Sequence, residues 1–207
     1  MKARRQKHDE LRSDFGCSPC PRRESHGTRS ALLCVCIGII LFGLVSPAFA
    51  EDRDNSEYSV KLAFLYNFAQ FVHWPSDAFQ SSSAPLTICV VGENPFAGEI
   101  GQSLRGRAVE NHPIELKSLS LQGDSSACQM IFVRAAETKA VARIFALSRG
   151  SNTLTVGEAP GFTARGGIIN LTTEDNRLRF EINVDAAAQT RLKISSKLLS
   201  LAKIVKK

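Results

Sequence analysis

Two short, uncharged apolar runs constrain the fold of this chain more than any other feature. They are Leu86–Val91 (LTICVV) and Met130–Val133 (MIFV). Runs of this length are typical of strands buried on both faces of a parallel sheet. A helix-forming segment follows each run, from Pro95 to about Leu104 and over Glu137–Ser148. This alternation predicts an α/β domain with helices on both faces of the sheet.

The remaining β-rich segments extend this sheet. They lie at residues 112–119, 153–156, 168–171 and 177–184. The last of them alternates apolar and polar residues and follows a turn, so we expect an antiparallel edge hairpin on an otherwise open, mostly parallel sheet. Asp185 is expected to begin a helix over 186–191, and Ser195 or Ser196 a final helix to about 205. All of these elements belong to one domain.

Residues 56–74 predict a helix that carries more than one apolar face. One stripe runs through positions 60, 64, 68, 71 and 72, and a second contains Leu62, Tyr66 and Ala69. Pro75 is expected to end the helix. Two interpretations remain open: the helix is deeply buried in its own fold, or Leu62, Tyr66 and Ala69 contact a partner or a second subunit.

The first 50 residues have the features of a signal peptide. A basic segment precedes an uncharged run of 15 residues, Ala31–Val45, and Ala48-Phe49-Ala50 supplies a small-x-small cleavage site. We expect cleavage after Ala50, with an uncleaved anchor as the alternative, and a periplasmic domain over 51–207. The leader carries eight Lys/Arg and four Asp/Glu, whereas residues 51–207 carry eighteen and sixteen. Most of the chain's +6 charge therefore lies in the leader, and a nucleic-acid-binding domain is not supported.

Cysteine usage follows the same division. Cys17, Cys20, Cys34 and Cys36 lie in the leader, where the Cys17–Cys20 spacing is interpreted as incidental. Only Cys89 and Cys128 remain after it. In an oxidising compartment these two are expected to form a disulfide if their strands are neighbours; otherwise they are two buried thiols.

The strand-to-helix turn at Gly92–Phe96 is the only candidate ligand site. Open α/β sheets bind ligands at such turns, so Glu93, Asn94 and Phe96 are candidate lining residues. The segment lacks the phosphate-loop and dinucleotide motifs, and turn and capping chemistry alone also explains it. No hydrolase or metalloprotease motif occurs, so we expect no catalytic residues, metal or cofactor.

Six motifs in order resemble the YfiR family (the DUF4154 domain) over about residues 56–205. They are Lys61…Phe64…Phe68…Phe71…Trp74-Pro75; Val91–Phe96; Cys128 before Ile131-Phe132-Val133; Leu154–Gly157; Gly166–Asn170; and Arg179–Val184 followed by Ile194–Leu199. The resemblance implies a periplasmic, non-enzymatic repressor. Such a protein docks on the periplasmic domain of an inner-membrane diguanylate cyclase and controls cyclic di-GMP and biofilm formation.

The resemblance also implies partners and a disulfide. An OmpA-like outer-membrane lipoprotein would sequester the repressor, and the repressor would be a homodimer that meets the membrane only through its partners. The redox-linked disulfide of the family maps onto Cys89 and Cys128, while the second pair of some relatives has no counterpart here. The alternative function is a small-ligand-binding periplasmic sensor that acts on a membrane receptor such as a histidine kinase.

Overall fold

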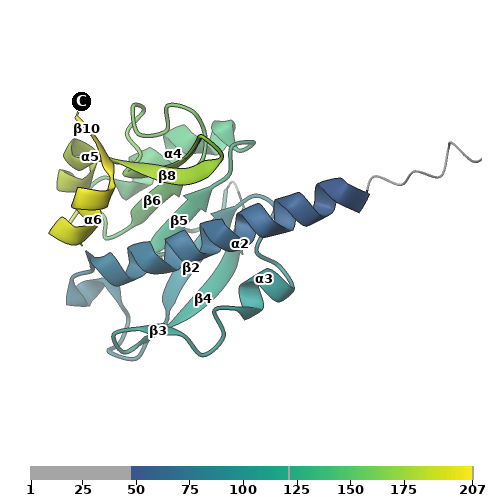
Figure 1. The fold of residues 1–207 in the computed structure, drawn as a ribbon. Coiled ribbons are helices and arrows are strands. Elements are labelled where there is room, and N and C mark those ends of the chain that lie inside the picture. The colour runs from purple at the N-terminus through teal and green to yellow at the C-terminus, as the bar shows by residue number, and fades with distance from the viewer. Residues whose placement is uncertain (1–47, 121, 207) are drawn as a thin grey trace, which may run out of the picture. The chain divides into compact units, whose positions relative to one another are not determined.

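An eight-stranded sheet forms the centre of the domain (Figure 1). The computed structural model describes residues 48–120 and 122–206, so residues 1–47 of the predicted signal peptide, with the four leader cysteines, lie outside the described residues. The strand order is β10-β8-β7-β6-β5-β2-β4-β3. The strands are β2 Leu86–Val91, β3 Ala108–Val109, β4 His112–Leu119, β5 Met130–Val133, β6 Leu154–Gly157, β7 Ile169–Glu174, β8 Arg177–Asn183 and β10 Lys203–Val205.

The sheet is mostly parallel, as predicted. Strand β2 pairs in parallel with β4 and β5, and the parallel pairing continues from β5 through β6 to β7. The hairpin β7–β8 is antiparallel and turns at Asp175 and Asn176, both with positive φ, as in the two-residue turns that suit twisted strands. Strand β10 pairs in parallel with β8 and therefore lies outside the hairpin.

Helices cover both faces of this sheet, which confirms the predicted layering. They are α2 Ala48–Phe71, the 3₁₀ turn η1 Ser76–Ala78, α3 Glu99–Gln102, α4 Thr138–Ser148, α5 Val184–Ala188 and α6 Ser196–Leu201. On one face Leu65 and Phe68 of α2 pack in a core with Ile88 and Phe132. On the other face α4 packs over alternate residues of the same strands, including Ile131. Each central strand is thus buried on both sides, as its uninterrupted apolar sequence requires.

The first helix ends earlier than predicted. It stops at Phe71 instead of continuing to Pro75, because Val72 and His73 form strand β1. This strand pairs antiparallel with β9, Lys193–Ile194, in a separate two-stranded sheet. Val72 is buried at 3% exposure. Pairing with a segment far along the chain therefore overrides the local helical pattern.

Three other element boundaries also differ from the prediction. Asn94 accepts a hydrogen bond from the Phe96 amide at 2.9 Å, but a turn follows and the helix of this segment spans only four residues. Asn183, rather than Asp185, caps α5 by accepting from the Ala186 amide. Ser195 caps α6 as predicted, but this helix ends at Leu201 because residues 203–205 join the sheet.

Candidate functional site

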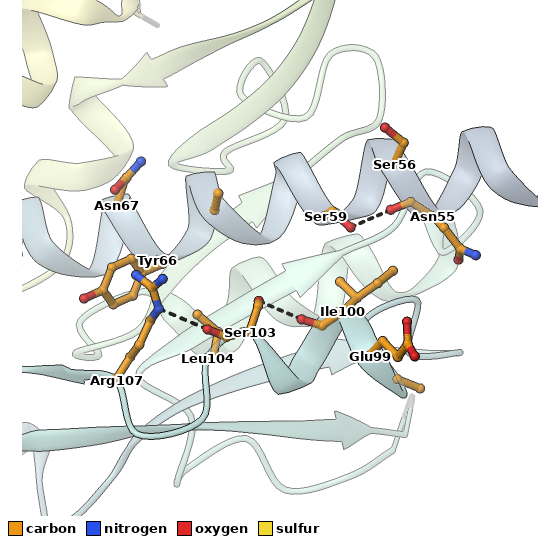
Figure 2. Close-up of a pocket in the computed structure, with 12 residues that line it drawn as sticks. Asn55, Ser56, Ser59, Tyr66, Asn67, Glu99, Ile100, Ser103, Leu104 and Arg107 are labelled. Atoms are coloured by element: carbon orange, nitrogen blue, oxygen red, sulfur yellow. Dashed lines mark hydrogen bonds between the residues drawn. The ribbon is translucent and has the colours of Figure 1, made fainter.

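An open groove lies between α2 and the α3 segment (Figure 2). Its volume is about 900 Å³. The lining residues are Asn55, Ser56, Ser59, Ala63, Tyr66 and Asn67 from α2, and Ala97, Glu99, Ile100, Ser103, Leu104 and Arg107 from the opposite wall. We call this feature the α2–α3 groove. It lies on the face of the sheet that α2 covers.

Short side chains at helical spacing create one wall of the groove. Ser59, Ala63 and Asn67 follow one another at intervals of four residues, so they lie on one side of α2. The Ser59 hydroxyl donates to the Asn55 carbonyl at 2.7 Å. Because these side chains are small, space remains between α2 and the α3 segment where larger residues would close it.

Tyr66 and Arg107 meet across one end of the groove (Figure 2). The Arg107 guanidinium carbon is 5.0 Å from the centroid of the Tyr66 ring, and its Nε donates to the Ser103 carbonyl at 3.0 Å. This geometry is that of a cation–π contact, in which the positive charge is attracted to the face of the aromatic ring. The groove therefore offers an aromatic ring, a guanidinium and the Asn67 amide, which suits binding of a partly polar surface.

The three residues predicted to form an interface on the first helix differ in burial. Leu62 and Ala69 are 1% and 0% exposed and belong to the core, so neither is available to a partner. For these two residues the alternative interpretation, burial in the protein's own fold, describes the structure. Tyr66 is half-buried and lines the α2–α3 groove. The helix is thus buried along its second stripe except at Tyr66.

The residues predicted to line a ligand crevice, Glu93, Asn94 and Phe96, are engaged in three different ways. Phe96 is 1% exposed, because its ring packs in the core 5.3 Å from that of Phe132. The Asn94 side chain is engaged in its own turn, and Glu93 points to Arg134, with 3.4 Å between Oε2 and Nη1. None of the three lines the α2–α3 groove. The turn therefore folds its one large side chain, Phe96, into the core.

A buried ion pair that the sequence analysis missed joins α2 to the carboxyl end of β6. Lys61 Nζ lies 2.6 Å from Glu158 Oε2, and the two side chains are 8% and 7% exposed. The other oxygen of Glu158 accepts hydrogen bonds from the Tyr58 hydroxyl and the Ala135 amide, each at 3.1 Å. Glu57 is a second, more exposed partner of Lys61 at 2.5 Å. This set of contacts fixes the position of α2 against the sheet.

The environment of this cluster shifts two pKa values upward. Burial raises the pKa of Tyr58, and the hydrogen bond with Arg134 acts in the opposite direction without cancelling it. Burial by itself lowers the pKa of Lys61, but the hydrogen bonds to Glu158 and Glu57 outweigh it and raise the pKa overall. The Lys61 ammonium is thus held charged, as expected for an ion pair that positions an element.

One sequence signal could have indicated this cluster. Arg134 directly follows β5, and Glu158 directly follows β6. Side chains after parallel strands gather at one edge of a sheet. The predicted ligand site at Gly92–Phe96 uses this rule only for the residues that follow β2. The contribution of Lys61 from α2 has no local sequence signal.

The Cys89–Cys128 disulfide is present in the structure. The two Cα atoms are 5.8 Å apart, and both residues are almost fully buried on the α4 face of the sheet. The bond connects β2 to the residue two positions before its neighbour β5. Because the α2–α3 groove lies on the opposite face, the disulfide stabilises the fold without lining the groove.

Neither histidine after residue 50 lies in a constellation suited to catalysis. His112 stacks on Phe79 with 3.6 Å between ring centroids, and its Nδ1 is 2.6 Å from the Ala84 carbonyl oxygen. His73 is exposed and lies 3.5 Å from Glu110. The part of the chain that the structure describes holds no group of three or more His, Cys, Asp or Glu placed to bind a metal. Nor does any helix within residues 48–120 and 122–206 have the length and apolar character needed to cross a membrane.

Most of the described chain, including the site, matches one known protein family. The family model DUF4154, described as YfiR/HmsC-like, matches residues 58–203. The matched region contains the complete central strands, the ion pair of Lys61 with Glu158 and both cysteines. It also contains all lining residues of the α2–α3 groove except Asn55 and Ser56.

Proposed function

Because this chain belongs to the YfiR/HmsC-like family, we propose that it is a periplasmic regulator of cyclic di-GMP signalling that acts by binding another protein and not by catalysis. The family match over residues 58–203 is the observation that carries this proposal. In this proposal residues 1–50 are a signal peptide that exports the domain. The regulated output is biofilm formation.

The proposed partner is the periplasmic domain of an inner-membrane diguanylate cyclase. A regulator without chemistry of its own changes such a partner by binding one of its states more tightly. Moving a two-state equilibrium from almost all active to almost all inactive requires an affinity ratio of about 10⁴ between the states. An OmpA-like outer-membrane lipoprotein would compete for the regulator and release the cyclase. We further propose that the regulator is a homodimer.

The α2–α3 groove is the surface that best fits partner binding. Protein interfaces are enriched in aromatic residues and arginine, and the groove presents Tyr66 with Arg107 across it. The ion pair of Lys61 with Glu158 and the disulfide hold the walls and the sheet in a fixed arrangement. A preformed surface loses less conformational freedom on binding.

Filling the groove tests this proposal in the bacterium. Ser59→Arg places a long side chain in the groove and removes only an exposed hydrogen bond to the Asn55 carbonyl. We expect cyclic di-GMP to rise to the level of a deletion strain, with the variant still present at normal abundance. Ser82→Arg, in an exposed loop after η1, is the matched control and should leave the nucleotide level unchanged. Unchanged cyclic di-GMP in the deletion strain itself would contradict the proposal.

A second function, sensing of a small ligand for a membrane receptor such as a histidine kinase, is favoured by the size of the groove. A volume of about 900 Å³ lies within the range of small-molecule sites. A ligand that binds the folded state raises the melting temperature in a saturable way. A thermal-shift screen of wild type and Ser59→Arg separates the two functions, because a sensing groove predicts stabilisation that only the wild type shows.

A further inference from the structure

Charge is strongly segregated within residues 51–207. Residues 191–207 contain six Lys/Arg and no acidic residue, whereas residues 51–190 contain twelve Lys/Arg and sixteen Asp/Glu, a net charge of −4. Arg191 is engaged, because its Nη1 lies 2.6 Å from Asp77 Oδ2. The lysines that follow it make the end of the chain a local cationic region on an otherwise slightly acidic domain.

Two of these lysines, Lys197 and Lys203, lie on elements that also carry exposed aliphatic side chains, α6 Ser196–Leu201 and β10 Lys203–Val205. Elements α6 and β10 lie next to each other beside the marked C-terminus (Figure 1). Leu201 is 68% exposed and Ile204 is 43% exposed; elsewhere among the described residues Val60 and Leu147 are large apolar residues of comparable exposure, at 47% and 48%. We define the C-terminal basic surface as Lys193, Lys197, Leu201, Lys203, Ile204 and Lys206.

Local geometry places charged and apolar groups side by side on this surface. Lys197 and Leu201 are four residues apart on α6, so they share one side of the helix. Ile204 lies in β10 directly beside Ile182 of β8, which places it on the face of the sheet that α2 and α6 cover. Lys203, the residue before Ile204 in this edge strand, points to the opposite face of the sheet. The surface therefore combines cations with two exposed aliphatic groups around this edge of the sheet.

The cations of the C-terminal basic surface are not neutralised by the fold. Lys193, Lys197, Lys203 and Lys206 form no ion pair with another described residue. Lys197 Nζ lies 5.2 Å from the centroid of the Phe71 ring, a contact that keeps its charge. Glu181 is the register partner of Lys203 in the neighbouring strand β8. Its carboxylate accepts a hydrogen bond from the Thr163 hydroxyl and forms no ion pair with Lys203.

We propose that the C-terminal basic surface binds the headgroups of an anionic phospholipid bilayer. The lysines would contact lipid phosphates, while Leu201 and Ile204 would enter the boundary between headgroups and acyl chains. Juxtaposed basic and aliphatic side chains bind anionic membranes in this way. This inference goes beyond the proposed function and replaces our expectation that membrane contact occurs only through partners.

The composition of the surface favours a bilayer over an acidic protein. Protein interfaces are enriched in Tyr, Trp, Phe and Arg and depleted in Lys. The C-terminal basic surface has four lysines and two aliphatic residues, and the aromatic ring beside it, that of Phe71, already contacts Lys197. Lysine is a flexible point charge without the planar fork that recognises one fixed carboxylate. A fluid layer of headgroups requires no such fixed geometry.

Vesicle sedimentation tests this inference without any protein partner. The protein as recovered from the bacterium is mixed with vesicles of equal parts phosphatidylglycerol and phosphatidylcholine, or of phosphatidylcholine alone. We expect sedimentation only with the anionic vesicles, weakening as salt is added. The triple variant Lys197→Gln, Lys203→Gln, Lys206→Gln should bind at least about tenfold more weakly, because each lysine near such a surface contributes about fivefold. Leu201→Ser should also weaken binding.

Matched controls separate this surface from overall charge and apolar content. The triple variant Lys139→Gln, Arg149→Gln, Arg177→Gln removes the same charge from exposed positions elsewhere, and Leu147→Ser removes a leucine that is 48% exposed on α4. Both controls should bind like the wild type. Absence of binding to anionic vesicles, or equal loss in the controls, would overturn the inference. If the wild type ignores vesicles while the C-terminal triple variant loses repression, the surface binds an acidic protein instead. Because no cyclase is present in the vesicle assay, its failure leaves the proposed function untouched.

Discussion

Glu158 is the main carboxylate partner of the buried Lys61 ammonium. We therefore expect its replacement to destabilise the packing of α2 against the sheet. Glu158→Gln leaves the buried ammonium with Glu57 as its remaining carboxylate partner. Breaking a buried ion pair from one side costs about 3–5 kcal/mol, and the retained partner reduces this to about 2–3 kcal/mol of unfolding free energy. Urea denaturation at neutral pH measures the difference. Glu57→Gln, at a position 52% exposed, should cost less than about 1 kcal/mol; equal losses in the two variants would contradict the assigned roles.

The same ion pair predicts a loss of stability in alkaline solution. The pKa of Lys61 is raised in the folded protein. A group of this kind contributes stability that is complete below its unfolded pKa, about 10.4 for lysine, and is lost as the pH rises through the folded value. The stability difference between wild type and Lys61→Met should therefore be constant at neutral pH and change only above about pH 10. A change confined to acidic pH would assign the effect to another group.

Phe162 occupies a space that only two glycines leave open. A Cβ built at Gly157 or at Gly167 would overlap the buried Phe162 ring. Gly167→Ala should therefore lower the free energy of unfolding by about 1–3 kcal/mol through overpacking. In a Phe162→Leu background the same substitution should cost clearly less, because the ring is gone. Urea denaturation of the four proteins in this cycle measures the coupling, and an unchanged cost would show that the Phe162 ring is not what resists the added methyl group.

At the level of elements, the sequence predicts those strand boundaries that a local pattern of apolar residues marks. Strands β2, β4 and β5 begin and end where predicted, because continuous or alternating apolar residues mark them directly. Val72-His73 and Lys203–Val205 were assigned to helices, yet both pair with strands distant along the chain. The α2–α3 groove was missed for the same reason. Its walls come from segments about 40 residues apart, and only their packing brings Tyr66 to Arg107.

The disulfide connects two of these elements, so its removal tests how strongly β2 depends on β5. The chain-entropy relation gives about 3–4 kcal/mol for a loop closed over a separation of 39 residues. We expect this loss in the double variant Cys89→Ala, Cys128→Ala by urea denaturation. Reductant should destabilise the wild type to a similar extent and leave the double variant unchanged. Insensitivity of the wild type to reductant in the unfolding transition would contradict the prediction.

For the whole molecule, the β4 edge of the sheet is a place where copies could associate through their strands. Strand β3 covers only the start of β4, where Ala108 and Val109 pair with Pro113 and His112. Beyond Ile114 no described strand lies outside β4. An unpaired edge can pair with another chain, and charged side chains on the edge oppose this. Glu115 and Lys117 supply such charges at about half exposure, 3.0 Å apart.

Replacing these charges should therefore change how the whole molecule associates. Glu115→Val with Lys117→Val would leave an uncharged, β-prone edge over residues 114–119. We expect this variant to show a mass that rises with protein concentration in size-exclusion chromatography with light scattering, beyond that of the wild type. The exchanged variant Glu115→Lys, Lys117→Glu keeps both charges and should behave like the wild type. If the exchanged variant associates as strongly as the valine variant, the specific ion pair protects the edge; if neither associates, the short strand β3 already protects it sufficiently.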